Sequence, residues 1–344
     1  MQQNHHNQRD WSAQRVAGGT KPPIPPLLDV IIIGAGPAGI TATVYAARRG
    51  LQTLLITGDI GGQMRMSADI QNWTGTTHST GPVLSQLFYD HVQLLWKQQD
   101  TFDLWLAEGD RVTPGGVQQV DGHFSLTTEG GQQYRSRTLI LAVGKHPRSL
   151  GIPGEEAARR TKTLSFSGTM DAALYRGKHV VVIGGGNSAL ETALQLEKFT
   201  GTITLCTDID RLIGDQVLID QILERTQTFT VRYKTHTEAI LLDEHDRVRG
   251  IALREDGGPR QELGCEGVFE QIGQSPSTGF LQSFVALDDH GQIITDRDTH
   301  TSVEGCFAAG DCTIQKHKQV IVAAGQGAMA ALESYYYLQN TTSL

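Results

Sequence analysis

The sequence contains little cysteine. Its 344 residues include four cysteines, Cys206, Cys265, Cys306 and Cys312, and no two of them form a C-x-x-C motif. Cysteine and histidine spacings typical of a zinc site are also absent from the sequence. This pattern favours four reduced thiols in a cytoplasmic protein, with a redox pair of Cys306 and Cys312 as the alternative. The sequence therefore predicts no metal site.

The sequence also lacks an excess of positive charge and a long apolar run. It carries 37 acidic against 29 basic residues, for a net charge of −8, which argues against a nucleic-acid partner. No apolar stretch approaches the ~18 residues that span a bilayer. The polar, histidine-rich N-terminus lacks the apolar core of a signal peptide. We therefore expect a cytoplasmic protein without a membrane span.

What the sequence does have is a glycine-rich turn after an apolar stretch. The branched apolar run 30–33 predicts a buried parallel strand, and a helix is expected over 37–49. Between them lies the motif Gly34-x-Gly36-x-x-Gly39 in the strand–turn–helix setting that a dinucleotide site requires. Gly34 permits the tight turn, Gly36 lets a pyrophosphate approach the backbone, and Gly39 lets the helix pack against the strand. The start of the helix then offers free N–H groups to the phosphates.

A second copy of this motif begins 150 positions later. The apolar run 179–183 leads into Gly184-x-Gly186-x-x-Ala189, and a helix is expected over 190–198. Two nucleotide sites in one chain indicate one cofactor that stays bound and one that visits.

The rest of the chain is expected to complete two α/β units. We interpret the strand-like pieces 103–106, 111–112 and 123–127 as one antiparallel meander, and residues 230–263 as a second. The other expected elements are strands over 53–57, 138–143, 202–206 and 267–272 and helices over 81–98 and 320–338.

The motifs resemble those of a known family. The chain resembles the low-molecular-weight thioredoxin reductases, which are two-domain pyridine nucleotide–disulfide oxidoreductases, and the reductase part of alkyl hydroperoxide reductase flavoproteins. The resemblance covers about residues 28–338. The motifs that carry it are Gly34-x-Gly36-x-x-Gly39, Gly61-Gly62-Gln63, Asn72-Trp73, Arg176-Gly177-Lys178, Gly184-x-Gly186-x-x-Ala189, Phe307-Ala308-Ala309-Gly310-Asp311, Lys318-Gln319 and Ala323-Ala324-Gly325.

The resemblance implies an α/β fold of two Rossmann-like three-layer domains with antiparallel β meanders, the second domain inserted in the first. It implies a discontinuous FAD-binding domain over 27–146 and 277–344, and an NAD(P)-binding-like domain over 147–276. Residues 1–26, rich in Gln, Asn, His, Gly and Pro, are predicted to be a disordered arm.

The resemblance also implies a homodimer whose inserted domain rotates about hinges near 145–151 and 273–276. It implies FAD on the first glycine turn, with Asp311 accepting a hydrogen bond from a ribityl hydroxyl. The residues expected to bind FAD are Gly34, Gly36, Pro37, Ala38, Gly39, Gly61, Gly62, Gln63, Asn72, Ala142, Gly144, Gly310, Asp311, Lys318, Gln319 and Val320. Those expected at the second nucleotide site are Gly184, Gly186, Asn187, Ser188, Ala189 and Asp208.

The chain departs from this family where a redox disulfide is expected. Family members carry C-x-x-C-Asp shortly before the second glycine turn, and that position falls on Ser167-Gly168-Thr169-Met170-Asp171. The aspartate is kept, but without the two cysteines the segment has no thiol–disulfide pair to carry two electrons. We therefore expect no standard thioredoxin reduction. Asp171 and His317 are our candidates for handling protons, with a surface histidine as the alternative for His317.

A second departure concerns the pyridine nucleotide. NADPH enzymes of this family carry a His-Arg-Arg run that clamps the 2′-phosphate, and here that run falls on Thr207-Asp208-Ile209. The Asp208 charge would oppose a 2′-phosphate by ~1–4 kcal/mol, whereas an aspartate suits a free 2′-hydroxyl. We predict NADH over NADPH. The alternatives are a pocket that binds no pyridine nucleotide and one that holds the adenosine diphosphate part of a second FAD.

These observations predict an FAD-dependent oxidoreductase of the thioredoxin reductase-like type without the active-site disulfide. Electrons would come from NADH or from a protein such as ferredoxin, and would pass through FAD to oxygen, a quinone, a second flavin or a partner protein. One alternative is a thioredoxin reductase that uses Cys306 and Cys312 as a displaced pair. Others are a flavin-based redox sensor with little turnover and a ferredoxin–NADP reductase, against which the missing arginine clamp argues.

Overall fold

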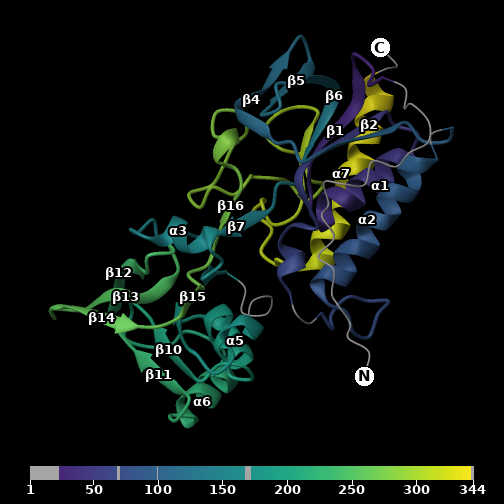
Figure 1. The fold of residues 1–344 in the computed structure, drawn as a ribbon. Helices are drawn as coiled ribbons and strands as arrows, with labels where there is room; N and C mark the ends of the chain where they lie inside the picture. Colours follow the sequence, from purple (N-terminus) through teal and green to yellow (C-terminus); the bar gives the residue numbers. More distant parts are fainter. Residues whose placement is uncertain (1–22, 68–69, 99, 167–171, 342–344) are drawn as a thin grey trace. The chain divides into compact units, whose positions relative to one another are not determined.

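The computed structural model describes residues 23–67, 70–98, 100–166 and 172–341. Most of the predicted arm, residues 1–22, therefore lies outside the described residues. The chain forms two compact units (Figure 1). The first comprises the chain up to Gly62, Ser85–Gly144 and the chain from Thr278 onward, and the second comprises Gln63–Leu84 and Lys145–Ser277.

A seven-stranded sheet forms the centre of the first unit, in the order β3-β2-β1-β6-β5-β4, with β17 paired to β6. Strands β3, β2, β1, β6 and β17 are parallel neighbours, whereas β4, β5 and β6 pair antiparallel. The bounds are β1 (Leu28–Ala35), β2 (Thr53–Ile60), β3 (Leu104–Glu108), β4 (Val112–Val120), β5 (His123–Thr128), β6 (Gln133–Leu141) and β17 (Cys306–Ala308).

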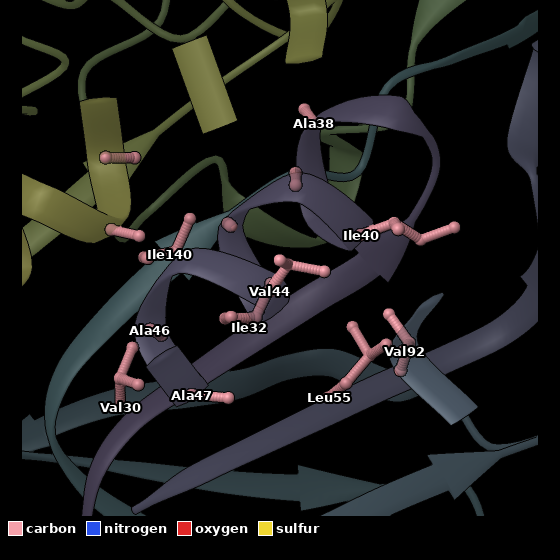
Figure 2. Packing of buried hydrophobic residues seen from close by; sticks show 14 of the residues in the cluster. Val30, Ile32, Ala38, Ile40, Val44, Ala46, Ala47, Leu55, Val92 and Ile140 are labelled. Atoms are coloured by element: carbon pink, nitrogen blue, oxygen red, sulfur yellow. The ribbon is translucent and has the colours of Figure 1, made fainter. Parts of the chain in front are cut away.

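Three helices pack on one face of this sheet: α1 (Pro37–Arg48), α2 (Gly81–Lys97) and α7 (Val320–Thr341). Because strand side chains alternate between faces, Val30 and Ile32 of β1 pack under α1 while Ile31 and Ile33 face the other way. Figure 2 shows α1 with Val44 and Ala47 above β1 and β2. Burial of such side chains contributes about 25 cal/mol per Å² of apolar surface, and this layer fixes the start of α1.

The second unit is built on a five-stranded parallel sheet in the order β11-β10-β9-β15-β8. One face packs on α5 (Asn187–Leu196) and α6 (Gln216–Glu224). The other packs on α3 (Glu155–Arg160) and a separate antiparallel sheet, β12-β13-β14. The strand bounds are β8 (Leu164–Ser165), β9 (His179–Ile183), β10 (Thr202–Cys206), β11 (Phe229–Arg232), β12 (Thr235–Leu242), β13 (Val248–Glu255), β14 (Arg260–Gly264) and β15 (Gly267–Glu270).

A short antiparallel pair, β7 (Lys145–Pro147) and β16 (Gln274–Pro276), lies at the sequence boundaries of the second unit. The Arg148 N–H donates to the Gly273 carbonyl at 2.9 Å beside this pair. The predicted hinge stretches are therefore joined to each other, and their rotation stays a prediction. Short 3₁₀ turns complete the described chain: η1 (Gly62–Met66), η2 (Ala172–Tyr175) and η3 (Gly279–Leu281).

The predicted helices α1, α2 and α7 are confirmed, but both predicted meanders need correction. The stretch 103–106 was assigned to the first meander, whereas β3 is a parallel edge strand against β2, with Leu55 opposite Leu106. The first meander is β4-β5-β6 instead. Within 230–263, β11 belongs to the parallel sheet and only β12, β13 and β14 form a meander. The apolar pattern of a short strand specifies burial, not the direction of its partner.

Two classes of feature are missing from the described chain. No helix in the described ranges is long and apolar enough to cross a membrane. No cluster of three or more His, Cys, Asp or Glu side chains suited to a metal ion occurs among the described residues.

Candidate functional site

The first glycine turn joins β1 to α1 in the first unit. Gly34 has a φ of +100°, which an L side chain rarely adopts, and a β-carbon there would lie 2.4 Å from the Ala142 carbonyl oxygen. A β-carbon on Gly39 would lie 1.7 Å from the Gly34 carbonyl oxygen. Backbone atoms fill both places, so the turn brings the end of β6 against the start of α1.

Two further loops converge on the start of α1. The Gly61 N–H donates to the Ala35 carbonyl at 2.7 Å, and a β-carbon on Gly62 would lie 3.3 Å from the Gly36 Cα atom. After β17, Gly310 adopts a φ of +83°, and a β-carbon there would lie 3.0 Å from the Ala38 Cβ atom. Gly61, Gly62 and Gly310 therefore lie against the start of α1 or the turn that leads into it.

This helix start fits an FAD pyrophosphate. Gly36 is the N-cap residue, no described side chain caps the helix, and Pro37 occupies its first turn. A β-carbon on Gly36 would meet no protein atom within 4 Å. Uncapped N–H groups beside open space at a helix N-terminus make an anion site. The residues present therefore fit the diphosphate of a dinucleotide.

The loop between β17 and α7 holds several other predicted residues. The Lys318 ammonium donates to the Thr313 carbonyl at 2.6 Å, which fixes the loop ahead of α7. Val320 begins that helix. Asp311, Lys318 and Val320 are partly buried, while His317 and Gln319 are exposed. Gly144, another residue expected to bind FAD, lies outside this loop: it follows β6 and has a φ of +61°.

Two predicted FAD ligands, Gln63 and Asn72, belong to the second unit. The Gln63 amide oxygen accepts a hydrogen bond from the Gln274 amide at 3.1 Å. Asn72 is exposed. The structure therefore groups neither residue with the first glycine turn, and their contact with a flavin stays a prediction.

The second glycine turn repeats the geometry of the first. Gly184 has a φ of +135°, and a β-carbon there would lie 2.3 Å from the Gln271 carbonyl oxygen and 3.3 Å from the Ala189 Cβ atom. Gly186 is the N-cap of α5, no described side chain caps that helix, and a β-carbon on Gly186 would meet nothing within 4 Å. This turn also fits a diphosphate.

The loop after β10 borders this second turn. Parallel pairing sets Cys206, the last residue of β10, beside Ile183, the residue before Gly184. Asp208 follows at the carboxyl edge of the sheet and is exposed. The Asn187 side-chain oxygen accepts the Asp215 N–H at 2.6 Å, which ties the loop to the start of α5. Ser188, in the first turn of α5, is exposed.

All four cysteines are free and buried. Burial raises the pKa of Cys306 to about 12 and the pKa of Cys312 to about 11. The Cys312 thiol lies 3.4 Å from the Ala309 carbonyl oxygen, inside the apolar face of the first unit. A thiol of this kind is a poor nucleophile at neutral pH, because the thiolate is the reacting form. The burial of both thiols argues against Cys306 and Cys312 as a displaced redox pair.

One predicted catalytic residue cannot be placed, and one notable residue was missed. Asp171, with Ser167–Met170, lies outside the described residues. Glu270, at the end of β15, was not predicted as a site residue, although a lone charge within the apolar run 268–272 was a visible signal. It is 2% exposed, and neither carboxylate oxygen has a hydrogen-bond partner among the described residues. Burial raises the pKa of Glu270 to about 8.

Known proteins match this chain over most of its length. The family model for pyridine nucleotide-disulphide oxidoreductases matches residues 28–327. The F subunit of alkyl hydroperoxide reductase from Staphylococcus aureus (strain NCTC 8325 / PS 47) is 36% identical over 311 residues, which cover 90% of this chain and 59% of that protein. The corresponding protein of Xanthomonas campestris pv. phaseoli is 34% identical over 92% of this chain and 58% of its own length. The chain thus spans about three fifths of these relatives.

Solved structures match over nearly their whole length. Lactococcus lactis thioredoxin reductase, in its FR conformation, is 30% identical with a TM-score of 0.78, covering 91% of this chain and 99% of that one. Thioredoxin reductase of T. acidophilum is 29% identical with a TM-score of 0.75 and the same coverage. The predicted α/β fold class of two Rossmann-like units is confirmed. The chain belongs to the pyridine nucleotide-disulphide oxidoreductase family.

Proposed function

We propose that this enzyme takes electrons from NADH and passes them through FAD to an acceptor that is not a thiol. Membership of the family implies FAD and a pyridine nucleotide as cofactors. Family membership does not specify NADH or a non-thiol acceptor. The non-thiol acceptor rests on the lack of a usable thiol pair, and NADH rests on Asp208.

The observation that carries the proposal is the lack of a usable thiol pair. The sequence has no C-x-x-C motif, and Ser167 to Met170 stand where the family motif would fall. The four cysteines present are all buried, and burial raises their pKa values to between about 11 and about 12. Disulfide exchange requires an accessible thiolate, so electrons that reach the flavin need another exit.

Asp208 supports NADH as the donor. It lies exposed at the carboxyl edge of the second unit's sheet, next to the strand that leads into the Gly184 turn. A carboxylate at the end of the second strand of such a unit accepts hydrogen bonds from the ribose hydroxyls of NADH. The same charge repels a 2′-phosphate. We therefore expect NADH to bind more tightly than NADPH.

The chain's own residues bind and orient the two nucleotides. The turn at Gly36 and the start of α1 would hold the FAD diphosphate, and the turn at Gly186 with the start of α5 would hold the NADH diphosphate. FAD supplies the redox chemistry when it is bound, because it accepts two electrons and passes them on singly or in pairs. Asp311 and Lys318, partly buried beside the start of α7, would orient it. The protein thus contributes placement and electrostatics.

A turnover assay with several acceptors tests this proposal. The FAD-loaded protein is supplied with NADH or, in parallel, with NADPH, and with oxygen, a water-soluble quinone, or oxidised thioredoxin. We expect NADH oxidation with oxygen or quinone and none with thioredoxin. Turnover with thioredoxin at the quinone rate would contradict the proposed exit of electrons. Turnover with NADPH but not NADH would contradict the proposed donor.

We propose that the chain acts as a homodimer, which sedimentation velocity tests directly. If NADH does not reduce the flavin, a redox protein such as ferredoxin is the next donor to examine. A second flavin in the second unit has no support from the relatives, so we expect one flavin per chain. A slow redox sensor would show flavin reduction by NADH but negligible turnover with every acceptor.

A further inference from the structure

Glu270 occupies a distinctive place in the second unit. It is the last residue of β15, and parallel pairing sets it beside Ile183, the residue before the Gly184 turn. From β9 the chain adds β10 and then β11 on one side of the sheet, whereas β15 lies on the other side of β9. In open α/β sheets a ligand binds at such a switch point, outside the carboxyl ends of the strands. Glu270 therefore stands where ligands of this fold bind.

The surroundings of Glu270 favour its neutral form. The charged groups that act on it are both from α3: Glu155 raises its pKa through its charge and through a side-chain hydrogen bond, and Arg159 lowers it. Glu155 is itself occupied, because its carboxylate accepts hydrogen bonds from Ser149 Oγ and from the Gly151 N–H at 2.7 Å. Neither Glu270 oxygen accepts a hydrogen bond from a described N–H or O–H group. A buried polar group without a partner is costly unless a ligand satisfies it.

Glu270 lines a cavity of about 180 Å³. Phe166, Gln271 and Gly273 form part of its wall, and so does Ser188 in the first turn of α5. Hence the start of α5, which fits a diphosphate, and the buried Glu270 carboxyl line the same space. Polar groups in such a cavity can fix the orientation of a small ligand's polar end.

The order of strands decides which end of a dinucleotide would enter this cavity. Asp208 lies at the end of β10, on one side of the central strand β9, and Glu270 lies at the end of β15, on the other side. A dinucleotide with its adenosine ribose at Asp208 and its diphosphate at the start of α5 extends toward β15. Its nicotinamide end then reaches the Glu270 side.

We propose that Glu270 is a positioning residue of the second unit, which donates a hydrogen bond from its neutral carboxyl group to the carboxamide oxygen of the reduced nicotinamide. This inference rests on the proposed NADH site. The reduced nicotinamide ring is uncharged, so it matches a neutral donor in a buried place. An ionised Glu270 offers only acceptor oxygens, so it cannot hold the carboxamide oxygen.

Two redox-inactive probes test this assignment on the FAD-loaded protein. Tetrahydro-NADH carries an uncharged ring with the carboxamide, whereas ADP-ribose has the adenosine and diphosphate without a nicotinamide. Dissociation constants are measured by calorimetry at pH 7 for the wild type, Glu270→Val and Glu270→Gln. Glu262→Gln, an exposed glutamate of β14, is the matched control.

We expect Glu270→Val to weaken the binding of tetrahydro-NADH about tenfold, the effect of one lost hydrogen bond. The dissociation constant of ADP-ribose should change less than twofold. For the wild type, the affinity for tetrahydro-NADH should fall as the pH rises through about 8. Glu270→Gln keeps a donor that does not titrate, so its affinity should stay constant between pH 7 and pH 9. The control variant should follow the wild type.

The outcomes separate this inference from the proposed function. If both probes bind and Glu270→Val changes their two affinities equally or not at all, the proposed role of Glu270 is wrong, while the proposed nucleotide site stands. If Glu270→Gln keeps the pH dependence of the wild type, the role of Glu270 is also wrong. If neither probe binds the wild type, both the NADH site and the inference are overturned.

Discussion

The α-carbon of Gly39 approaches the carbonyl oxygen of Gly34 so closely that a β-carbon on Gly39 would lie 1.7 Å from that oxygen. Gly36, between them in the same turn, has open space on its side-chain face. One turn therefore contains a glycine that the protein's packing requires and a glycine that leaves room for something else. This difference allows the FAD site to be tested with two glycine-to-alanine substitutions, each of which adds one methyl group.

The substitution Gly39→Ala should destabilise the first unit. Its methyl group collides with backbone rather than with a flexible side chain, so strand β1 and helix α1 must separate. We expect the free energy of unfolding of the apoprotein to fall by roughly 2–4 kcal/mol, as for other overpacked sites. Chemical denaturation followed by circular dichroism measures this change.

The substitution Gly36→Ala should have the opposite profile. The φ of Gly36 is −75°, which alanine adopts without strain, so the apoprotein should keep its stability within about 0.5 kcal/mol. The methyl group would occupy the space where the FAD diphosphate approaches the backbone. We expect FAD content after purification to drop severalfold. Full FAD content in this variant would contradict the assignment of the site.

Asp208 should control the choice of pyridine nucleotide. Replacing it with asparagine removes a charge that opposes the 2′-phosphate by ~1–4 kcal/mol, so Asp208→Asn should raise the ratio of NADPH to NADH efficiency by about tenfold or more. The rate of flavin reduction by each nucleotide, measured by stopped-flow absorbance, gives the ratio. Asp210→Asn is a control, because Asp210 already pairs with Arg211 at 3.7 Å. An equal change in both variants would deny Asp208 a specific role.

The four thiols should be unreactive in the native protein. All are buried, and burial raises each pKa to between about 11 and about 12, so few thiolates are available near pH 7. A chromogenic disulfide reagent should titrate no rapid thiol in the folded protein and four in denaturant. Two rapid thiols in the native enzyme would restore Cys306 and Cys312 as a candidate pair.

Glu270 should make the folded protein less stable at alkaline pH. Its pKa is raised from 4.5 to about 8 by burial, so the folded state binds a proton that the unfolded chain releases. This stabilisation is complete below pH 4.5 and is lost as the pH rises through about 8. Glu270→Gln should therefore gain stability relative to the wild type between pH 5 and pH 9. The gain has an upper bound of roughly 5 kcal/mol, at about 1.4 kcal/mol for each tenfold change in the acid dissociation constant. Urea titrations across this range check it, with Glu262→Gln as the control.

Local sequence signals predicted the parts of the fold that depend on neighbouring residues. Each glycine turn combines an apolar strand, a fixed glycine spacing and a helix within about 20 residues, and both were recognised for that reason. The helix α7 was also predicted, but its close approach to α1 was not. A β-carbon on Gly327 would lie 2.0 Å from the Ala38 carbonyl oxygen of α1.

Partners distant in the sequence were harder to predict. Strand β3 pairs in parallel with β2, and β11 pairs in parallel with β10, yet their apolar patterns fit an antiparallel neighbour equally well. Glu270 was not predicted as a site residue, because the glycine motifs assign no role to a single charged residue in the run Val268–Ile272. Its burial depends on α3, more than 100 residues earlier in the sequence. A single sequence does not reveal that contact.

An anaerobic titration of the FAD-loaded protein with NADH tests the central claim most directly, because it identifies the donor and counts the electrons that the enzyme holds. The proposed mechanism predicts that one equivalent of NADH per flavin abolishes the oxidised flavin absorbance and that no further NADH is consumed. Consumption of two equivalents would reveal a second two-electron centre, such as a disulfide, and would contradict the proposed non-thiol chemistry. Unchanged absorbance with NADH would contradict the proposed donor.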